Sequence, residues 1–206
     1  MQIDNKGGQT NGGSAAMASG KLIFITGGVR SGKSRFAEEE AKRLFDDTGS
    51  RLHYIACGRR TDQEMEIRIQ RHQEDRTESE IPWTNWEFPL NITLAAEKVS
   101  GKSVVLLDCL TTLLDNELFL PGKALDLEHQ QAVIRKILSG IHAIQDKVQF
   151  LIVVSNELTM DTAFDNDVLH MYKRLLGLLH QSLVSKANEA YLVESGLPLK
   201  MKGGTA

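Results

Sequence analysis

The stretch Gly-Gly-Val-Arg-Ser-Gly-Lys-Ser at residues 27–34 constrains the fold more than any other feature of this chain. It satisfies the pattern Gly-x-x-x-x-Gly-Lys-Ser, in which the backbone N–H groups of a glycine-rich loop surround phosphate. An apolar run at residues 22–26 precedes the loop, and a segment rich in Ala, Glu and Lys follows it. A loop between a buried strand and the positive end of a helix is suited to phosphate binding. A glycine-rich turn without function is the alternative, but it leaves the agreement of strand, spacing and helix unexplained.

Short apolar runs alternate with segments rich in Ala, Leu and charged residues over the rest of the chain. Apolar runs of this length are typical of strands buried on both faces of a parallel sheet. Strands are predicted at residues 22–26, 52–56, 104–107, 150–154, 190–193 and 199–201. Helices are predicted at residues 33–45, 62–76, 91–98, 127–146 and 165–187, and loops at 76–90, with a short strand, and at 115–126. The alternation predicts an α/β fold with a mostly parallel sheet and helices on both faces.

The length and charge of the chain limit its class. A chain of 206 residues suits one domain. Residues 1–20 are small and polar, so we expect a disordered tail followed by a single nucleotide-binding domain at 21–206. A net charge of −3 without a basic block argues against nucleic-acid binding through bulk charge. No apolar run approaches the roughly 20 residues that a membrane span needs.

The two cysteines, Cys57 and Cys109, each follow a predicted buried strand. A free thiol in such a place behaves as a small hydrophobic side chain. We therefore interpret both as reduced and structural, and we expect a cytoplasmic protein.

The phosphate loop carries the residues of a nucleotide site. Lys33 is expected to reach the terminal phosphates of a nucleoside triphosphate, and the Ser34 hydroxyl to ligate magnesium. Such a loop needs a carboxylate that orients the metal, and Asp108 follows four apolar residues at the end of a predicted strand. An Asp in this position can also simply cap the next helix. Because the phosphate loop is present, we expect Asp108 to act at the metal.

A histidine lies on the predicted helix at residues 62–76. At helical spacing, Met65, Ile69 and His72 fall on nearly one face, with Arg68 beside them and Arg76 one turn beyond. A histidine flanked by arginines can face a nucleotide. Spacing alone favours the simpler interpretation, a partly exposed helix histidine without a task.

Six stretches together resemble one family of enzymes. They are TGGVRSGKSRFAE, YIAC, DQEMEIRIQRHQEDR, WTNWE, LLDCLTTLLDN and VSNE. Their order and approximate spacing resemble the bifunctional adenosylcobinamide kinase/adenosylcobinamide-phosphate guanylyltransferase of cobalamin assembly, from about residue 21 to residue 202. The resemblance implies a P-loop NTPase fold of the recombinase-like type and a homotrimer.

The resemblance also implies a two-step reaction. Family members phosphorylate the aminopropanol hydroxyl of adenosylcobinamide with ATP or GTP, and then transfer GMP from GTP to that phosphate with release of pyrophosphate. The GMP passes through a histidine, and the matching position is His72. The implied catalytic residues are His72, Lys33 and Asp108, with Mg²⁺ at Ser34 and Asp108 and a corrinoid as the second substrate. The residues expected to border the nucleotide are Gly27, Gly28, Val29, Arg30, Ser31, Gly32, Lys33, Ser34, Cys57, Gly58, Arg59, Gln73, Glu74, Asp75, Arg76, Glu87 and Asp108.

Several of these residues have simpler interpretations. Glu87 can contact ribose or guanine, although a loop carboxylate is more often solvated. Trp83 and Trp86 are expected to anchor their segment to the domain rather than to stack on a corrinoid. The pair Asn156–Glu157 matches the Asn-Glu of the family, where the acidic residue can bind magnesium or deprotonate the acceptor hydroxyl.

One segment departs from the family pattern. After Asn-Glu, family members continue with glycines and a Val-Pro, whereas this chain reads LTMDTAFDND at residues 158–167. This difference motivates a second hypothesis, a P-loop kinase of another small hydroxyl substrate without guanylyl transfer. A third hypothesis is a module whose partner surface changes with the bound nucleotide.

Overall fold

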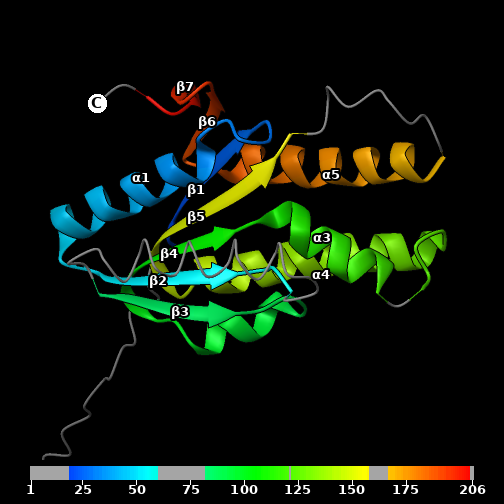
Figure 1. Ribbon diagram of the computed structural model, residues 1–206. Helices are drawn as coiled ribbons and strands as arrows, with labels where there is room; N and C mark the ends of the chain where they lie inside the picture. The colour runs from blue at the N-terminus through cyan, green and yellow to red at the C-terminus, as the bar shows by residue number, and fades with distance from the viewer. Residues whose placement is uncertain (1–18, 60–81, 121, 158–166, 205–206) are drawn as a thin grey trace, which may run out of the picture.

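The computed structural model describes residues 19–59, 82–120, 122–157 and 167–204. Most of the predicted tail, the predicted helix at 62–76 and nearly all of the departing segment at 158–167 lie outside these ranges. The described strands form one seven-stranded sheet in the order β3-β2-β4-β5-β1-β6-β7 (Figure 1). Their bounds are β1 Lys21–Gly27, β2 Arg51–Ala56, β3 Trp83–Glu87, β4 Gly101–Asp108, β5 Val148–Asn156, β6 Glu189–Glu194 and β7 Leu197–Lys202.

The sheet is parallel except for its last strand. Strands β1 to β6 pair in parallel with their neighbours, and β7 pairs antiparallel with β6. A turn at Ser195 and Gly196 joins β6 to β7, with φ of 50° and 82°. Strand β5 lies between β1, which leads into the phosphate loop, and β4, which ends at Asp108. This separation by one strand is the recombinase-like arrangement that the resemblance implies.

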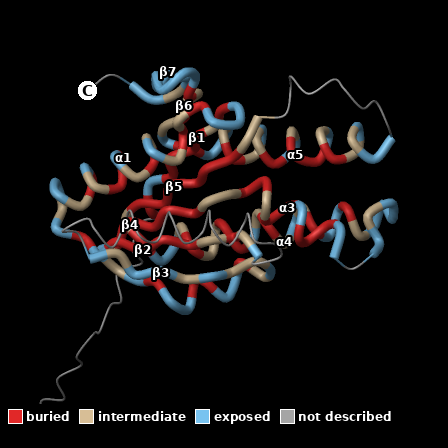
Figure 2. Tube along the Cα trace, in the orientation of Figure 1, coloured by how far each residue is buried: buried red, intermediate tan, exposed pale blue. Residues whose placement is uncertain are grey.

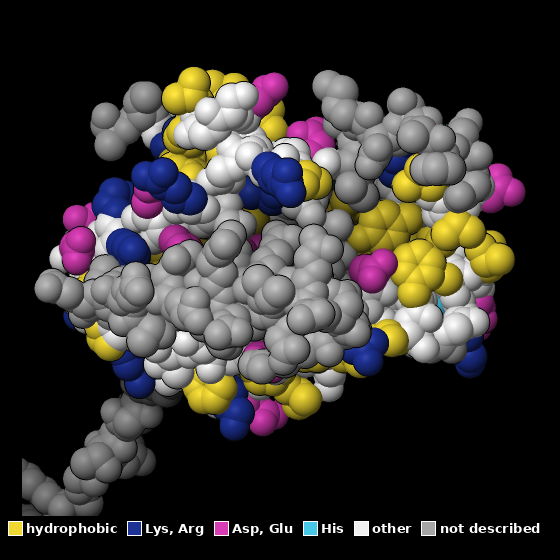
Figure 3. Space-filling model, viewed as in Figure 1, with side chains coloured by type: hydrophobic (Ala, Val, Ile, Leu, Met, Phe, Trp, Pro, Cys, Tyr) yellow, Lys and Arg dark blue, Asp and Glu magenta, His cyan; other side chains and the backbone are white. Residues whose placement is uncertain are grey.

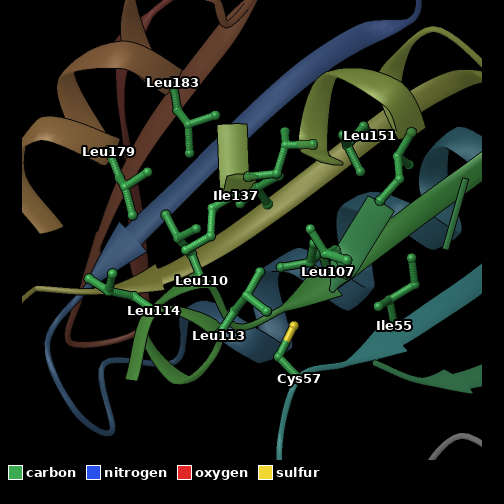
Figure 4. Packing of buried hydrophobic residues seen from close by; sticks show 14 of the residues in the cluster. Ile55, Cys57, Leu107, Leu110, Leu113, Leu114, Ile137, Leu151, Leu179 and Leu183 are labelled. Carbon is green, nitrogen blue, oxygen red and sulfur yellow. The ribbon is translucent and has the colours of Figure 1, made fainter. Parts of the chain in front are cut away.

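Helices cover both faces of the sheet, as predicted. Strand β1 alternates, so that Ile23 and Ile25 pack with the apolar side chains of helix α1 (Lys33–Thr48), while Leu22 and Phe24 pack on the other face. The second face is covered by the 3₁₀ helix η1 (Ile92–Glu97) and by helices α3 (Leu110–Phe119), α4 (Leu127–Gln145) and α5 (Asp167–Lys186). The central strands are therefore buried on both sides (Figure 2), and leucines of α3 and α5 pack against them together with Ile137 of α4 (Figure 4).

The predicted loop at residues 115–126 is wrong over its first part. Residues 115–119 continue helix α3, which begins at Leu110. Leu110, Leu113, Leu114 and Leu118 are fully buried at helical spacing, whereas Asp-Asn-Glu at 115–117 interrupts the apolar period that sequence inspection relies on. Asn116 and Glu117 are nevertheless buried in the helix, because both make hydrogen bonds to residues outside it. The helix predicted at 91–98 is the 3₁₀ helix η1, with narrower bounds.

The described surface carries mixed charge. On the face seen in Figure 3, acidic and basic side chains are interspersed, and apolar side chains gather at one end over α3 and α4. Exposed apolar side chains there include Phe119, Leu120, Leu125 and Leu127. Within the described ranges, no helix has both the length and the apolar character of a membrane span.

Two helical glycines give a matched test of packing. A Cβ added at Gly140 of α4 would overlap Ile92 Cγ2 and lie 3.0 Å from the backbone nitrogen of Thr93, whereas a Cβ at Gly177 of α5 would meet nothing within 4 Å. Alanine gains about 1 kcal/mol of helix propensity over glycine, but overpacking costs about 1–3 kcal/mol. We expect Gly140→Ala to lower the free energy of unfolding and Gly177→Ala to raise it, as measured by urea denaturation. Equal effects of the two substitutions would contradict this account.

Candidate active site

The phosphate loop has positive φ angles at two positions, as expected of a loop that curls around phosphate. Arg30 and Gly32 have φ of 59° and 90°, and the Ser31 N–H donates to Gly28 O over 3.2 Å. Helix α1 begins at Lys33, so the last two residues of the 27–34 stretch form its first turn. Gly28, Val29 and Arg30 are exposed, so the outer part of the loop is open to a ligand. Positive φ at alternate positions curls successive N–H groups toward one point, which is the geometry of an anion site.

Two side chains of the loop suit phosphate. Lys33 is buried, and its Nζ donates to the carbonyl oxygen of Gly28 over 3.0 Å, so the amine lies back against the loop. Ser31 Oγ is buried without a hydrogen-bond partner among the described residues. A buried hydroxyl without a partner is costly. A phosphate oxygen in the loop would satisfy it.

The turn between β6 and β7 supports the phosphate loop, a contact that sequence inspection missed. The Gly196 N–H donates to Ser31 O over 2.8 Å, and a Cβ at Gly32 would lie 3.2 Å from Gly196 Cα. A Cβ at Gly27 would overlap the carbonyl oxygen of Val193 on β6 and lie 2.6 Å from Ser31 Oγ. These close approaches explain why glycine is needed at positions 27 and 32. No local pattern in the sequence indicates the contact of this turn with residue 31.

Parallel pairing brings the other predicted residues to the same edge of the sheet. Gly27 is in register with Asn156, Asp108 with Val154, and Ala56 with both Asp108 and Glu87. The carboxyl ends of these strands therefore lie together, as expected for a ligand site of an open α/β sheet. The Glu157 N–H also donates to Gly27 O over 2.9 Å, which ties the end of β5 to the start of the phosphate loop.

Asp108 faces the side of the sheet on which α1 lies. Directly paired residues of parallel strands point to the same face, and Asp108 pairs with Ala56, which packs in the cluster that contains the apolar residues of α1. The Tyr54 hydroxyl donates to Asp108 Oδ2 over 3.1 Å. The helix-capping alternative is not supported, because the N-cap of α3 is Cys109 and not Asp108.

The loop after β2 is held by α3. Asn116 Nδ2 donates to the carbonyl oxygens of Cys57 and Pro89, each over 3.0 Å. The next residue, Glu117, accepts from the Asn91 N–H over 2.6 Å and from Lys136 Nζ over 2.8 Å. One buried turn of α3 therefore fixes the segments that follow β2 and β3. These two polar residues belong to the stretch that sequence inspection took for a loop.

The burial of Cys57 supports the interpretation that its thiol is structural and not reactive. Its side chain is fully buried and points into the leucine cluster (Figure 4). Burial raises the pKa of the Cys57 thiol, and the nearby Cys109 and Asp108 raise it further. The two cysteines form no disulfide, and Cys109 packs against the cluster on the opposite face of the sheet.

Both tryptophans anchor β3, as predicted. Trp86 Nε1 donates to His53 Nδ1 over 3.3 Å, and the Trp83 ring contacts Tyr54 edge to face with centroids 6.3 Å apart. Each packs against a core cluster, Trp86 on one face of the sheet and Trp83 on the other. Glu87 is exposed at the end of the same strand.

A chain of hydrogen bonds holds the end of β5 against α3 and α5. The Asn156 N–H donates to Thr111 Oγ1 over 2.8 Å, Thr111 Oγ1 lies 3.2 Å from Ser155 Oγ, and Ser155 Oγ lies 2.7 Å from His180 Nε2. Burial lowers the pKa of His180 to about 4, so this imidazole is neutral at pH 7. Asn156 and Glu157 are thus placed through a partly buried histidine that no sequence motif indicated.

The predicted site is only partly within the described residues. Gly27 to Ser34, the loop at 57–59, Glu87 and Asp108 are described and converge on one edge of the sheet. His72, Gln73, Glu74, Asp75 and Arg76 lie outside the described residues. Their roles therefore stay predictions.

The partly buried His180 predicts a pH dependence of stability. A histidine of the unfolded chain titrates near pH 6.5, whereas burial lowers the pKa of His180 to about 4 in the folded protein. Between these values the unfolded chain binds a proton that the folded protein does not bind. The contribution of His180 to stability is therefore fully present above pH 6.5 and falls by about 3 kcal/mol as the pH is lowered to 4.

The measurement is urea denaturation of the parent protein and of His180→Gln at several pH values between 7 and 4. Burial also lowers the pKa of His53 and of His142, but both proteins share those contributions. The variant is expected to be less stable at pH 7 and to lose less stability on acidification. Parallel curves for the two proteins would contradict the assignment to His180.

Comparisons with known proteins identify a family and relatives that are similar over most of the chain. Residues 23–201 match the model of the family described as cobinamide kinase / cobinamide phosphate guanyltransferase. The chain is 34% identical over 187 residues to the bifunctional adenosylcobalamin biosynthesis protein CobU of Escherichia coli (strain K12), covering 88% of this chain and 99% of that protein. It is 32% identical over 182 residues to the corresponding CobP protein of Pseudomonas aeruginosa, covering 87% and 96%. Among solved structures, a KaiC-like protein of Pyrococcus horikoshii OT3 aligns with a TM-score of 0.45 and 12% identity, covering 84% of this chain and 71% of that one.

Proposed function

The chain belongs to the cobinamide kinase/cobinamide phosphate guanyltransferase family, and from this premise we propose how its residues carry out both reactions. The enzyme phosphorylates adenosylcobinamide with ATP or GTP and then transfers GMP from GTP to the new phosphate, which gives adenosylcobinamide-GDP. The observation that carries the proposal is the convergence of a complete phosphate loop and Asp108 on one edge of the sheet. We further propose that residues 21–206 act as one cytoplasmic domain and assemble as a trimer.

In the kinase step, the aminopropanol oxygen attacks the γ-phosphorus of the triphosphate and the nucleoside diphosphate leaves. Lys33 is placed at the start of α1 to neutralise charge on the transferred phosphoryl group. The loop N–H groups and the Ser31 hydroxyl hold the phosphate oxygens. Glu157 follows β5 beside the loop and is a candidate to accept the proton of the attacking hydroxyl.

Ser34 and Asp108 would hold Mg²⁺ together with phosphate oxygens. Both side chains offer the oxygen ligands that this ion prefers. Asp108 faces the side of the sheet on which α1 lies, and Ser34 is in the first turn of that helix. The ion supplies charge neutralisation at the β- and γ-phosphates when it is bound.

In the guanylyl step, an imidazole nitrogen of His72 attacks the α-phosphorus of GTP, and pyrophosphate leaves. A phosphate oxygen of adenosylcobinamide-phosphate then attacks the same phosphorus, and the imidazole leaves. A neutral imidazole is a competent nucleophile near pH 7, and its phosphoramidate is reactive enough to pass the GMP on. Arg76, one helical turn from His72 in the predicted helix, is a candidate to balance the charge of the leaving pyrophosphate.

The covalent step has a direct test. Incubation with α-labelled GTP and Mg²⁺ is expected to give an acid-labile, alkali-stable protein adduct that is missing from His72→Ala. His142→Ala is the matched control, because His142 lies on α4 and contacts Lys186, away from the phosphate loop. Adduct formation by His72→Ala, or no adduct in the parent protein, would refute the role of His72.

A product assay separates this function from the kinase hypothesis that the altered segment motivates. Adenosylcobinamide is incubated with ATP alone, GTP alone or both, and the phosphate and GDP derivatives are separated by chromatography. We expect both derivatives in the parent protein, the phosphate alone in His72→Ala, and neither in Lys33→Ala. Phosphate without the GDP derivative in the parent protein would favour a kinase that lacks the guanylyl step.

A further inference from the structure

We propose that Tyr54 is a positioning residue that orients the Asp108 carboxylate for magnesium. This inference rests on the proposed role of Asp108 at the metal. The Tyr54 hydroxyl donates to Asp108 Oδ2 over 3.1 Å. Because a phenol hydroxyl has only one proton to donate, its direction fixes one carboxylate oxygen.

The sheet itself places the phenol. Tyr54 lies on β2 in register with Leu106, two residues before the Ala56–Asp108 pair on the neighbouring strand β4. Alternation along a strand puts Tyr54 on the same face as Ala56, and that is the face on which Asp108 points toward α1. The side chain therefore extends along the sheet toward its carboxyl edge, and its hydroxyl meets the carboxylate there.

The ring of Tyr54 has little freedom to move. It is only 5% exposed and packs in the cluster formed with α1. The Trp83 ring contacts it edge to face. A rigid ring makes its hydroxyl a fixed donor, so the hydrogen bond costs little additional side-chain entropy. A mobile surface donor could not impose one carboxylate orientation in this way.

The hydrogen bond divides the tasks of the two carboxylate oxygens. With Oδ2 held by the phenol, Oδ1 is left to face the metal or one of its bound waters. Hydrogen bonds to an ionised acceptor are the stronger ones, and residues that hold a metal ligand in place typically contribute about 10–100-fold to metal affinity or activity. Because Tyr54→Phe leaves the Asp108 side chain itself in place, we expect an effect at the lower end of this range, about 10-fold.

The test removes one oxygen atom. Binding of guanylyl imidodiphosphate, a GTP analogue, to the full chain is measured by calorimetry over a range of Mg²⁺ concentrations, and Mn²⁺ binding is followed by electron paramagnetic resonance. Tyr54→Phe is expected to raise the half-saturating Mg²⁺ concentration about 10-fold, to change the Mn²⁺ spectrum, and to leave metal-free nucleotide binding unchanged. An unchanged Mg²⁺ requirement would overturn the proposal.

Tyr191→Phe is the matched control. Its hydroxyl also donates to a carboxylate, that of Glu189, but this pair lies at the start of β6, away from the carboxyl edge. The control loses the same atom from the same kind of hydrogen bond. It is expected to keep the Mg²⁺ requirement of the parent protein, and a shift equal to that of Tyr54→Phe would overturn the specific role of Tyr54.

A double substitution separates failure of this inference from failure of the proposed metal site. If Tyr54 acts through Asp108, then Tyr54→Phe adds no further shift to Asp108→Asn, whereas independent effects would add. A shift for Asp108→Asn without one for Tyr54→Phe refutes Tyr54 alone. No shift for either variant refutes the role of Asp108 and, with it, this inference.

Discussion

The hydrogen bonding of β1 between β5 and β6 is the constraint on which the rest of the site depends. Both neighbours run parallel to β1, so all three strands deliver their carboxyl ends to the point where the phosphate loop begins. The loop is then held from both sides, because Gly27 O accepts from the Glu157 N–H and Ser31 O accepts from the Gly196 N–H. A phosphate loop whose backbone is fixed before the ligand arrives loses less conformational entropy on binding.

The two faces of the sheet serve different parts of the site. On the face of α1, Tyr54 and Asp108 lie near the helix that carries Lys33 and Ser34. On the opposite face, α3 and α5 hold the connections that leave the strands, through Asn116 at the loop after β2 and through the Thr111–Ser155–His180 chain at the end of β5. In the proposed function, side chains on the face of α1 bind the metal and the phosphates. Side chains on the opposite face hold in place the segments that follow β2 and β5.

Polar side chains in the interior hold these segments in place, and the site therefore depends on each of them keeping its hydrogen-bond partners. Asn116 and Glu117 are buried in α3 with their hydrogen-bonding groups satisfied by backbone and by Lys136. Removing one partner from such a group costs more than the bond itself contributes, because the other partner stays buried without one. The same reasoning applies to His180, whose neutral form is required in the folded state. Stability and the placement of the catalytic loops therefore depend on the same few side chains.

The sequence by itself determined the α/β class, the strands, the phosphate loop and the family, because apolar periodicity and the Gly-x-x-x-x-Gly-Lys-Ser spacing are local properties. It also indicated Asp108, since a residue after a buried strand must lie at the edge of the sheet. Only the tertiary structure decided that residues 115–119 are helical, that Gly196 supports the phosphate loop, and that Tyr54 and His180 contact the site. Each of these depends on partners that are distant in the sequence, such as Cys57 for Asn116 or Ser31 for Gly196. Strand order brings such partners together, and no local pattern of residue types encodes that order.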